Sequence, residues 1–222
     1  MCSLITSRTS CSRSSREVAE KAAELGVTDD ELRLLRVLTP LAKLTTARQS
    51  VAAASEVVEA FGGAGYVEDT GIPTLLRDAQ VLSIWEGTTN VLSLDTLRAL
   101  ESAGGMTTVR AELERCAAQV ADPALVPVVR AAAQAVERAE TWLEDAMRAG
   151  RAEAEAGARR FALTLGRALE AALLASHAQW EAGRGEQDAG RTARRLAMNG
   201  IDLVHRPLPD TSDTREAQAG FA

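Results

Sequence analysis

Apolar residues recur along this chain at steps of three and four, and glycine or proline interrupts them at intervals. Leu41, Leu44, Val51 and Val58 follow this spacing, and a pair of glycines comes shortly after. Such spacing places apolar side chains on one face of an α-helix, and glycines commonly end one. Since no β-branched run alternates with polar residues, no strand is predicted. We expect an all-α fold built from helical bundles.

The interruptions divide the pattern into two groups of helices. Asp29 and Asp30 suit one helix N-terminus, and Thr39 and Pro40 suit the N-cap and first residue of another. In the first group, helices are expected over 17–25, from 29 onward, from 40 to the glycines at 62 and 63, and over 73–79. A further helix is expected to begin at 88–90, with Val91, Leu94 and Leu97 facing inward. The second group is expected as four antiparallel helices over 107–120, 124–148, 151–182 and 188–205.

The same interruptions predict a domain organisation. Residues 17–105 form one helical domain, and residues 106–206 form an additional C-terminal helical bundle beyond the glycine-containing joint at 102–108. Residues 1–16 are rich in Ser, Thr and Arg and contain no acid, so we expect a disordered or spurious start. Residues 207–222 are expected to form a flexible tail.

Composition narrows the classes of function. The 222 residues are 46% hydrophobic and 3% aromatic, and the net charge of −6 is spread without a strong basic patch. Nucleic-acid binding therefore lacks general electrostatic support. No apolar run approaches the ~20 residues of a membrane-spanning helix, and no secretory signal is recognisable. We expect a cytoplasmic protein, or one of the mitochondrial matrix if residues 1–16 belong to a transit peptide.

Potential metal ligands are few and scattered. Cys2, Cys11 and Cys116 do not make a disulfide framework or a metal-binding spacing. His177 and His205 lie far apart and lack partners at ligand spacing, so we assign them to ordinary packing or surface positions. The sequence predicts no metal site, a reducing compartment, and a buried, structural Cys116.

Residues 61–90, "FGGAGYVEDTGIPTLLRDAQVLSIWEGTTN", differ from the rest of the chain. They hold five of the 16 glycines and the single tyrosine. Thr88 and Thr89 stand at an expected helix N-terminus, which favours an anion such as phosphate. Glu86 follows the apolar run 81–85, and burial against an apolar wall prepares a carboxylate to act as a base near neutral pH. Each of these features, taken singly, is also common in purely structural segments.

The order and spacing of residues 59–98, "EAFGGAGYVEDTGIPTLLRDAQVLSIWEGTTNVLSLDTLR", resemble the C-terminal helical domain of acyl-CoA dehydrogenases. The shared features are a Gly-Gly-x-Gly-Tyr turn, an Arg-Asp pair and an aromatic-Glu-Gly-Thr segment. The resemblance is greatest to the branch that includes adaptive alkylation-response flavoproteins. It extends more weakly over 32–100, and the helices after 106 resemble the longer extension of that branch.

The resemblance implies a chemical role for Glu86. In the family, the matching glutamate removes the α-proton of an acyl-CoA thioester while a hydride leaves the β-carbon for FAD. The backbone N–H of Glu86 matches the donor to the thioester carbonyl, and Gly87 belongs to the same substrate contact. We assign Arg77 and Asp78, the Arg-Asp pair, to structural ion pairing.

The resemblance also implies FAD as cofactor. Trp85 stands where an aromatic residue lies beside the flavin, and the glycine pair matches backbone that approaches the FAD of a neighbouring subunit. Glu59 is a departure, because many members have glutamine there. The implied contacts are Glu59, Gly62, Gly63, Trp85, Thr88 and Asn90. The implied partners are an acyl-CoA substrate, electron-transfer flavoprotein as a candidate acceptor, and further copies of the chain.

Family members also carry an N-terminal helical domain and a middle β-domain, which this sequence lacks, so we expect a fragment that is inactive alone. One alternative is a non-catalytic helical oligomerisation or interaction module. Another is a DNA-associated protein of the alkylation-response type, for which Arg191, Arg194 and Arg195 form the local basic cluster. Trp142 and Trp180 are expected to anchor packing of the later helices.

Overall fold

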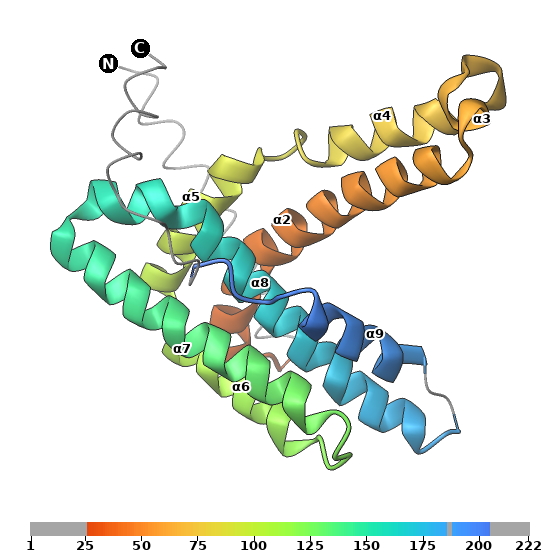
Figure 1. Cartoon of the computed structure of the whole chain (residues 1–222). Helices are drawn as coiled ribbons and strands as arrows, with labels where there is room; N and C mark the ends of the chain where they lie inside the picture. The colour runs from red at the N-terminus through yellow and green to blue at the C-terminus, as the bar shows by residue number, and fades with distance from the viewer. Residues whose placement is uncertain (1–25, 186–187, 205–222) are drawn as a thin grey trace, which may run out of the picture.

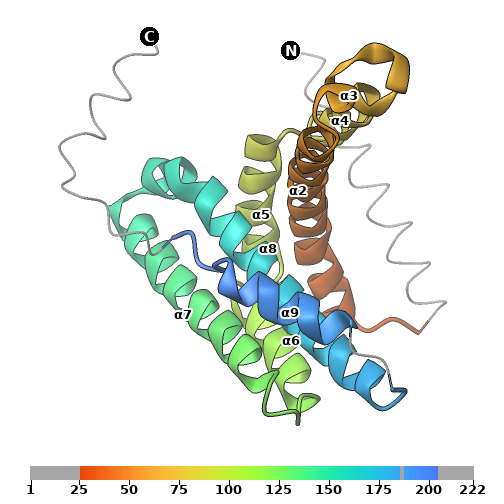
Figure 2. The same cartoon turned by 45° about the vertical axis from the view of Figure 1, so that its right-hand side comes forward.

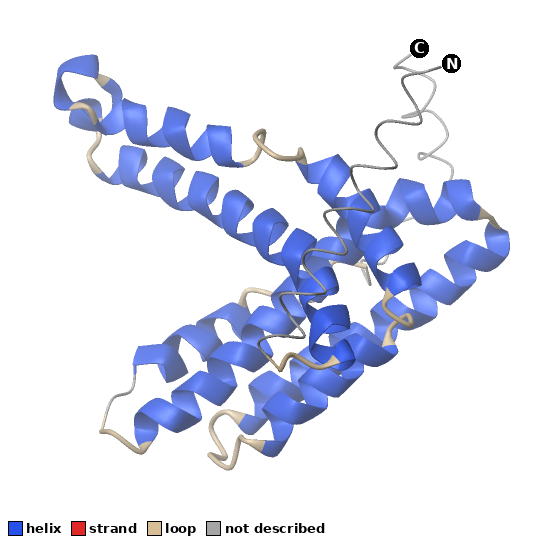
Figure 3. Ribbon diagram, turned by 180° about the vertical axis from the view of Figure 1, so that it is seen from behind, coloured by secondary structure: helices blue, strands red, loops and turns tan. Residues whose placement is uncertain are grey.

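The computed structural model describes residues 26–185 and 188–204, and within these ranges every regular element is helical (Figures 1 and 3). The elements are α2 (Asp29–Ala60), α3 (Gly63–Tyr66), the 3-10 helix η1 (Glu68–Thr70), α4 (Ile72–Leu82), α5 (Thr89–Ser102), α6 (Thr107–Ala118), α7 (Val126–Ala149), α8 (Arg151–Ala182) and α9 (Asp188–Met198). The predicted all-α fold is confirmed. The expectations for 1–16, 17–25, His205 and 207–222 lie outside the described residues.

The helices form a bundle and a projecting arm. In Figure 1, α6, α7 and α9 surround α8, while the C-terminal half of α2 and the antiparallel α4 extend away as an arm tipped by α3. Figure 2 shows α5 and the N-terminal half of α2 lying against α8. One hydrophobic cluster includes Leu41 of α2, Leu100 of α5, Leu113 of α6 and Leu165 of α8. The core is therefore continuous across the joint at 102–108.

Small residues on α8 allow its neighbours to approach closely. Eight alanines of this helix are at most 4% exposed: Ala154, Ala158, Ala162, Ala168, Ala171, Ala172, Ala175 and Ala178. A Cβ added at Gly166 would lie 2.3 Å from Cγ2 of Thr45 on α2. One added at Gly157 would lie 2.0 Å from Cζ2 of Trp142 on α7. Trp142 also packs against Phe161, with ring centroids 5.5 Å apart, so its predicted anchoring role is confirmed.

The predicted helix start at Thr39 is wrong, because α2 runs without a break from Asp29 to Ala60. Its N-cap is Thr28, which forms a capping box with Glu31. The Thr39 hydroxyl donates to the carbonyl of Leu35 at 2.7 Å, as it does within a helix. A proline inside a helix costs ~3 kcal/mol. Here Pro40 itself is buried between other core residues of α2, and that burial offsets the cost.

The inward face predicted for α5 is displaced by one residue. Val91 is 52% exposed, whereas Leu92 and Leu100 are buried. The buried stripe also contains Ser93 and Thr96. Their hydroxyls donate to carbonyls four residues earlier, which makes burial of these polar groups tolerable. Leu94 and Leu97 are half-buried and line a cavity beside α5, and Leu97 also packs against the core, as predicted.

Three further expectations need correction. The helix predicted over 188–205 ends at Met198, and α4 extends to Leu82. Trp180 is 55% exposed and does not anchor the bundle. Its ring stacks on His177 at 5.3 Å, and the guanidinium of Arg184 lies 4.0 Å above it.

A bidentate ion pair joins the two helices that lead into and out of the arm. The Arg36 guanidinium of α2 donates two hydrogen bonds of 2.9 Å to the Asp95 carboxylate of α5. This hydrogen bonding lowers the pKa of Asp95 below its ordinary value of 3.8, although partial burial acts in the opposite direction. The pair fixes the relative position of α2 and α5 where they lie against α8.

The contact of Gly166 with Thr45 generates a first prediction. Gly166→Ala should lower the free energy of unfolding by about 1–3 kcal/mol, because the new methyl overpacks the α2–α8 interface. Adding Thr45→Ser removes the opposing methyl and should restore the stability, with up to ~1 kcal/mol of further gain from the helix propensity of alanine. Urea denaturation of the single and double variants measures both effects. If the single variant is as stable as the parent chain, this contact does not limit the helix spacing.

The Arg36–Asp95 pair generates a prediction on pH. Because folding lowers the pKa of Asp95, the unfolded chain binds the proton more tightly, and the stabilisation is present above pH ~4 and lost as the pH falls further. Asp95→Asn should therefore be less stable than the parent at neutral pH, with a difference that shrinks in acid. Thermal unfolding across acidic and neutral pH tests this. The control Asp145→Asn, which removes an exposed carboxylate paired within α7, should give no such shrinking difference.

Candidate functional site

The glycine pair that the sequence singled out forms the turn at the tip of the arm. Gly62 has a φ of 56°, a left-handed conformation that glycine adopts without steric cost. Gly65 packs directly on α2, where a Cβ would lie 2.0 Å from the carbonyl oxygen of Val58. Apart from the adjoining residues and the local helix backbone, no described atom lies within 4 Å of a Cβ built at Gly62 or Gly63. The backbone of the pair is therefore open to an approaching group.

An ion pair closes the loop that follows. Arg77 of α4 donates to both carboxylate oxygens of Glu68, at 3.0 and 2.8 Å. The Thr70 hydroxyl donates to the carbonyls of Ala64 and Val67. The structural ion pairing assigned to Arg77 is thus observed, but its partner is Glu68 and not the adjacent Asp78.

The segment between α4 and α5 has an unusual backbone. Glu86 has a φ of 56°, and it is the only residue other than glycine with a positive φ in the described part of the chain. Gly87 follows with a φ of 117°, and a Cβ there would lie 3.2 Å from Cδ2 of Leu92. Left-handed backbone is unfavourable for residues with a Cβ and is often found where function requires it. Residue spacing alone did not indicate this conformation.

The N-terminus of α5 is open, as the sequence predicted. Thr88 is the N-cap, and its side chain makes no capping hydrogen bond. The first backbone bond of the helix runs from the N–H of Leu92 to the carbonyl of Thr88, at 2.9 Å. The amides of Thr89, Asn90 and Val91 therefore remain available, and the helix dipole favours an anion in front of them.

A lysine of α2 reaches this segment. The Lys43 Nζ donates to the carbonyl of Leu82 at 2.7 Å and lies 5.9 Å from the ring centroid of Trp85. Lys43 and Leu82 are 39 positions apart, so the spacing of residues along the chain could not have indicated their contact. Sequence reasoning missed Lys43 for that reason.

The predicted site residues form two separate groups. Trp85, Glu86, Thr88 and Asn90 belong to the junction of α4 and α5, which is the base of the arm in Figure 1. Glu59 and the glycine pair belong to the junction of α2 and α3, which is its tip. The 11 residues of α4 separate the groups by roughly 16 Å at 1.5 Å per residue. A single chain therefore does not bring the two groups together.

Both groups lie on an exposed apolar surface. Ile84 and Trp85 are 64% and 63% exposed, Phe61 is 58% exposed, and the Glu86 side chain is exposed as well. No described side chain hydrogen-bonds to the Glu86 carboxylate. The apolar residues expected to bury Glu86 do precede it in the sequence. Within residues 26–185 and 188–204, however, they do not enclose its side chain.

Cys116 and His177, the other residues considered as ligands, lie in surroundings typical of packing and surface positions. Cys116 is fully buried as predicted, and burial raises the pKa of its thiol to about 11, helped by the charge of Glu112. His177 pairs with Glu181 at 3.2 Å on the exposed end of α8. No cluster of metal-ligating side chains occurs in the parts of the chain that the structure describes. The helices in those parts are also too polar or too short to cross a bilayer.

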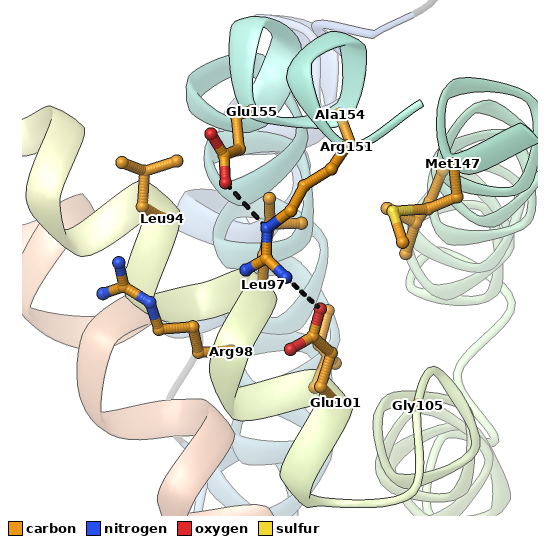
Figure 4. Close-up of a pocket in the computed structure, with 11 residues that line it drawn as sticks. Leu94, Leu97, Arg98, Glu101, Gly105, Met147, Arg151, Ala154 and Glu155 are labelled. Atoms are coloured by element: carbon orange, nitrogen blue, oxygen red, sulfur yellow. Dashed lines mark hydrogen bonds and ion pairs between the residues drawn. The ribbon is translucent and has the colours of Figure 1, made fainter. Parts of the chain in front are cut away.

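A cavity with aliphatic walls lies elsewhere in the fold. Figure 4 shows one of about 130 Å³ between α5, α7 and α8, with aliphatic walls that include Leu97 and Met147. Arg151 lies across it, 2.9 Å from Glu155 and 3.9 Å from Glu101. With Arg98 the rim carries two charges of each sign, which favours no particular ligand charge. None of the predicted site residues lines this cavity.

Comparison with known proteins identifies the family. Residues 7–101 match the family model described as acyl-CoA dehydrogenase, C-terminal domain. Residues 106–216 match the one described as acyl-CoA dehydrogenase 11 C-terminal domain-like. The two matches meet near the joint between α5 and α6.

Individual relatives agree with these matches. The chain is 40% identical to acyl-CoA dehydrogenase family member 11 of Caenorhabditis elegans over 163 residues, which are 70% of this chain and 26% of the relative. It is 39% identical over 71 residues to the putative acyl-CoA dehydrogenase AidB of Escherichia coli K12, covering 32% of this chain and 13% of that protein.

A solved structure extends the similarity to the fold. The crystal structure of C. elegans ACDH-11 in complex with C11-CoA aligns with a TM-score of 0.73 and 34% identity, over 89% of this chain and 34% of that one. The chain thus spans about a quarter to a third of the length of these C. elegans relatives. It belongs to the acyl-CoA dehydrogenase family and corresponds to the C-terminal helical domains of its members.

Proposed function

We propose that this chain supplies the catalytic base and part of the flavin site of an FAD-dependent acyl-CoA dehydrogenase. The observation that carries the proposal is the backbone at Glu86. A left-handed glutamate followed by glycine stands directly before an open helix N-terminus and beside exposed apolar residues. The complex of the relative ACDH-11 with C11-CoA supports an acyl-CoA as the substrate.

The residues present fit a flavin nucleotide at two places. The α5 N-terminus offers free amides and the Thr88 hydroxyl, which suit phosphate oxygens. The open backbone at Gly62 and Gly63 leaves room for close approach of a planar or phosphate group. FAD, when bound, supplies a hydride acceptor. Because the two places lie at opposite ends of the arm, we propose that they contact different FAD molecules in an oligomer.

The chemistry of the chain itself centres on Glu86. Its carboxylate would take the proton from the carbon next to the thioester carbonyl, as a general base. Its N–H has no acceptor among the described residues, so it is free to donate to the thioester oxygen as charge develops there. Enclosure by the remaining domains of an acyl-CoA dehydrogenase would exclude water from this exposed surface.

The exposed apolar arm also supports a second candidate function, an oligomerisation module. Phe61, Tyr66, Leu75, Ile84 and Trp85 are each 55–82% exposed, and so many exposed large apolar side chains in one arm are typical of an interface. This function requires no chemistry at Glu86. A stable oligomer of the assembled protein that holds no flavin would favour it over the enzymatic proposal.

The role of Glu86 is testable in a fusion protein in which this chain replaces the matching C-terminal region of C. elegans family member 11. Glu86→Gln should slow reduction of the flavin by an acyl-CoA at least about 100-fold, because the general base is lost. The flavin content should stay constant. Anaerobic stopped-flow absorbance measures the rate. The matched control is Glu144→Gln, on the exposed face of α7. If the flavin of the Glu86→Gln variant is reduced as fast as that of the control, the assignment is refuted.

The strained backbone gives a prediction that does not require activity. Glu86→Gly should make the chain about 1 kcal/mol more stable than Glu86→Ala, because only alanine keeps the Cβ that disfavours a left-handed residue. Chemical denaturation of the isolated chain measures the difference. Equal stabilities would show that the left-handed conformation at residue 86 carries no strain, which would remove this support for a functional role.

A further inference from the structure

The carboxyl end of α4 lacks a cation of its own. α4 has no basic residue in its last turn, where the dipole and the unpaired carbonyls favour one. The amides of Ser83, Ile84 and Trp85 bond to the carbonyls of Gln80 and Val81. These bonds leave the Leu82 carbonyl to be satisfied from elsewhere, and the Lys43 ammonium satisfies it at 2.7 Å.

Lys43 fixes the segment at the residues that precede Glu86. It bonds to Leu82 and also lies over the face of Trp85, at the outer limit of cation–π contact. Within the described residues, no other side chain hydrogen-bonds to the segment 82–88 from outside it. After Trp85, the next backbone N–H with an acceptor belongs to Leu92. Glu86 and Gly87 thus have no backbone hydrogen bonds of their own.

The other end of the segment is held by packing. Gly87 lies against Leu92, which is buried at the start of α5. On α2, Lys43 lies between Leu41 and Leu44, each 1% exposed, so its backbone belongs to the rigid part of the bundle.

We infer that Lys43 is a positioning residue for Glu86: its bond to Leu82 and its contact with Trp85 hold the segment 82–88 in the geometry that presents the carboxylate. The inference rests on the proposed function of Glu86. Lys43 itself is not placed near the reacting atoms. It acts through the backbone, by holding the residues before Glu86 against the rigid part of α2.

The first test uses the isolated chain and hydrogen exchange. Lys43→Met should speed exchange of the hydrogen-bonded amides of Ser83, Ile84 and Trp85 about tenfold, because the charge-assisted hydrogen bond that holds this turn is lost. Exchange in α8 should stay unchanged, which shows that the fold is intact. Arg48→Met removes an exposed cation from the same helix and should not change the exchange rates of these amides. Lys43→Arg should restore much of the protection. Unchanged exchange in Lys43→Met would overturn the inference.

The second test uses the fusion protein described above. Lys43→Met should lower the rate of flavin reduction at saturating acyl-CoA about 10- to 100-fold, as expected for a misplaced catalytic group. The KM and the flavin content should change little, and Lys43→Arg should recover most of the rate. A parent-like rate for Lys43→Met, beside an inactive Glu86→Gln, would refute the role of Lys43 alone. A parent-like rate for Glu86→Gln would instead refute the proposed function.

Discussion

Close packing around α8 is the constraint on which the rest of the structure depends. Alanines and glycines line this helix on several sides, so α2 and α7 approach it until side chains meet its backbone. Thr45 over Gly166 and Trp142 over Gly157 leave no room for a methyl group. Dense interiors of this kind transmit small displacements rather than absorbing them. The position of α2, and of everything attached to it, therefore follows from the surface of α8.

Only the N-terminal half of α2 is packed into the rigid bundle. Its buried residues extend only to Ala47, and the remaining residues of the helix lie in the arm. Lys43 lies just inside the buried part, so the segment carrying Glu86 is tied to the bundle. The glycine turn at 62 and 63 is tied only to the arm. The fold thus anchors the proposed catalytic base to its most rigid part and leaves the tip free to meet another surface.

Much of the fold followed from the spacing of apolar residues, but contacts between distant elements did not. Proline at position 40 indicates a helix start by local rules, and burial of this residue in the core outweighs those rules. For α5, Val91 and Leu92 are both apolar, and the packing of the neighbouring helices decides that Leu92 is the buried one. The roles proposed for the candidate site residues came from the family resemblance and not from periodicity. The left-handed φ of Glu86 and the bond from Lys43 to Leu82 depend on the tertiary structure, so no periodicity could reveal them.

The energetics of the segment 82–88 explain why it needs support from α2. A glutamate in the left-handed region is disfavoured, and neither Glu86 nor Gly87 gains a backbone hydrogen bond in return. Left alone, the segment would relax toward conformations in which the carboxylate points elsewhere. The Lys43 bond at one end and the packing of Gly87 on Leu92 at the other restrict those conformations. In the proposed function, the exposed carboxylate of Glu86 can therefore be held in place before a substrate or a covering domain arrives, which reduces the ordering that binding must supply.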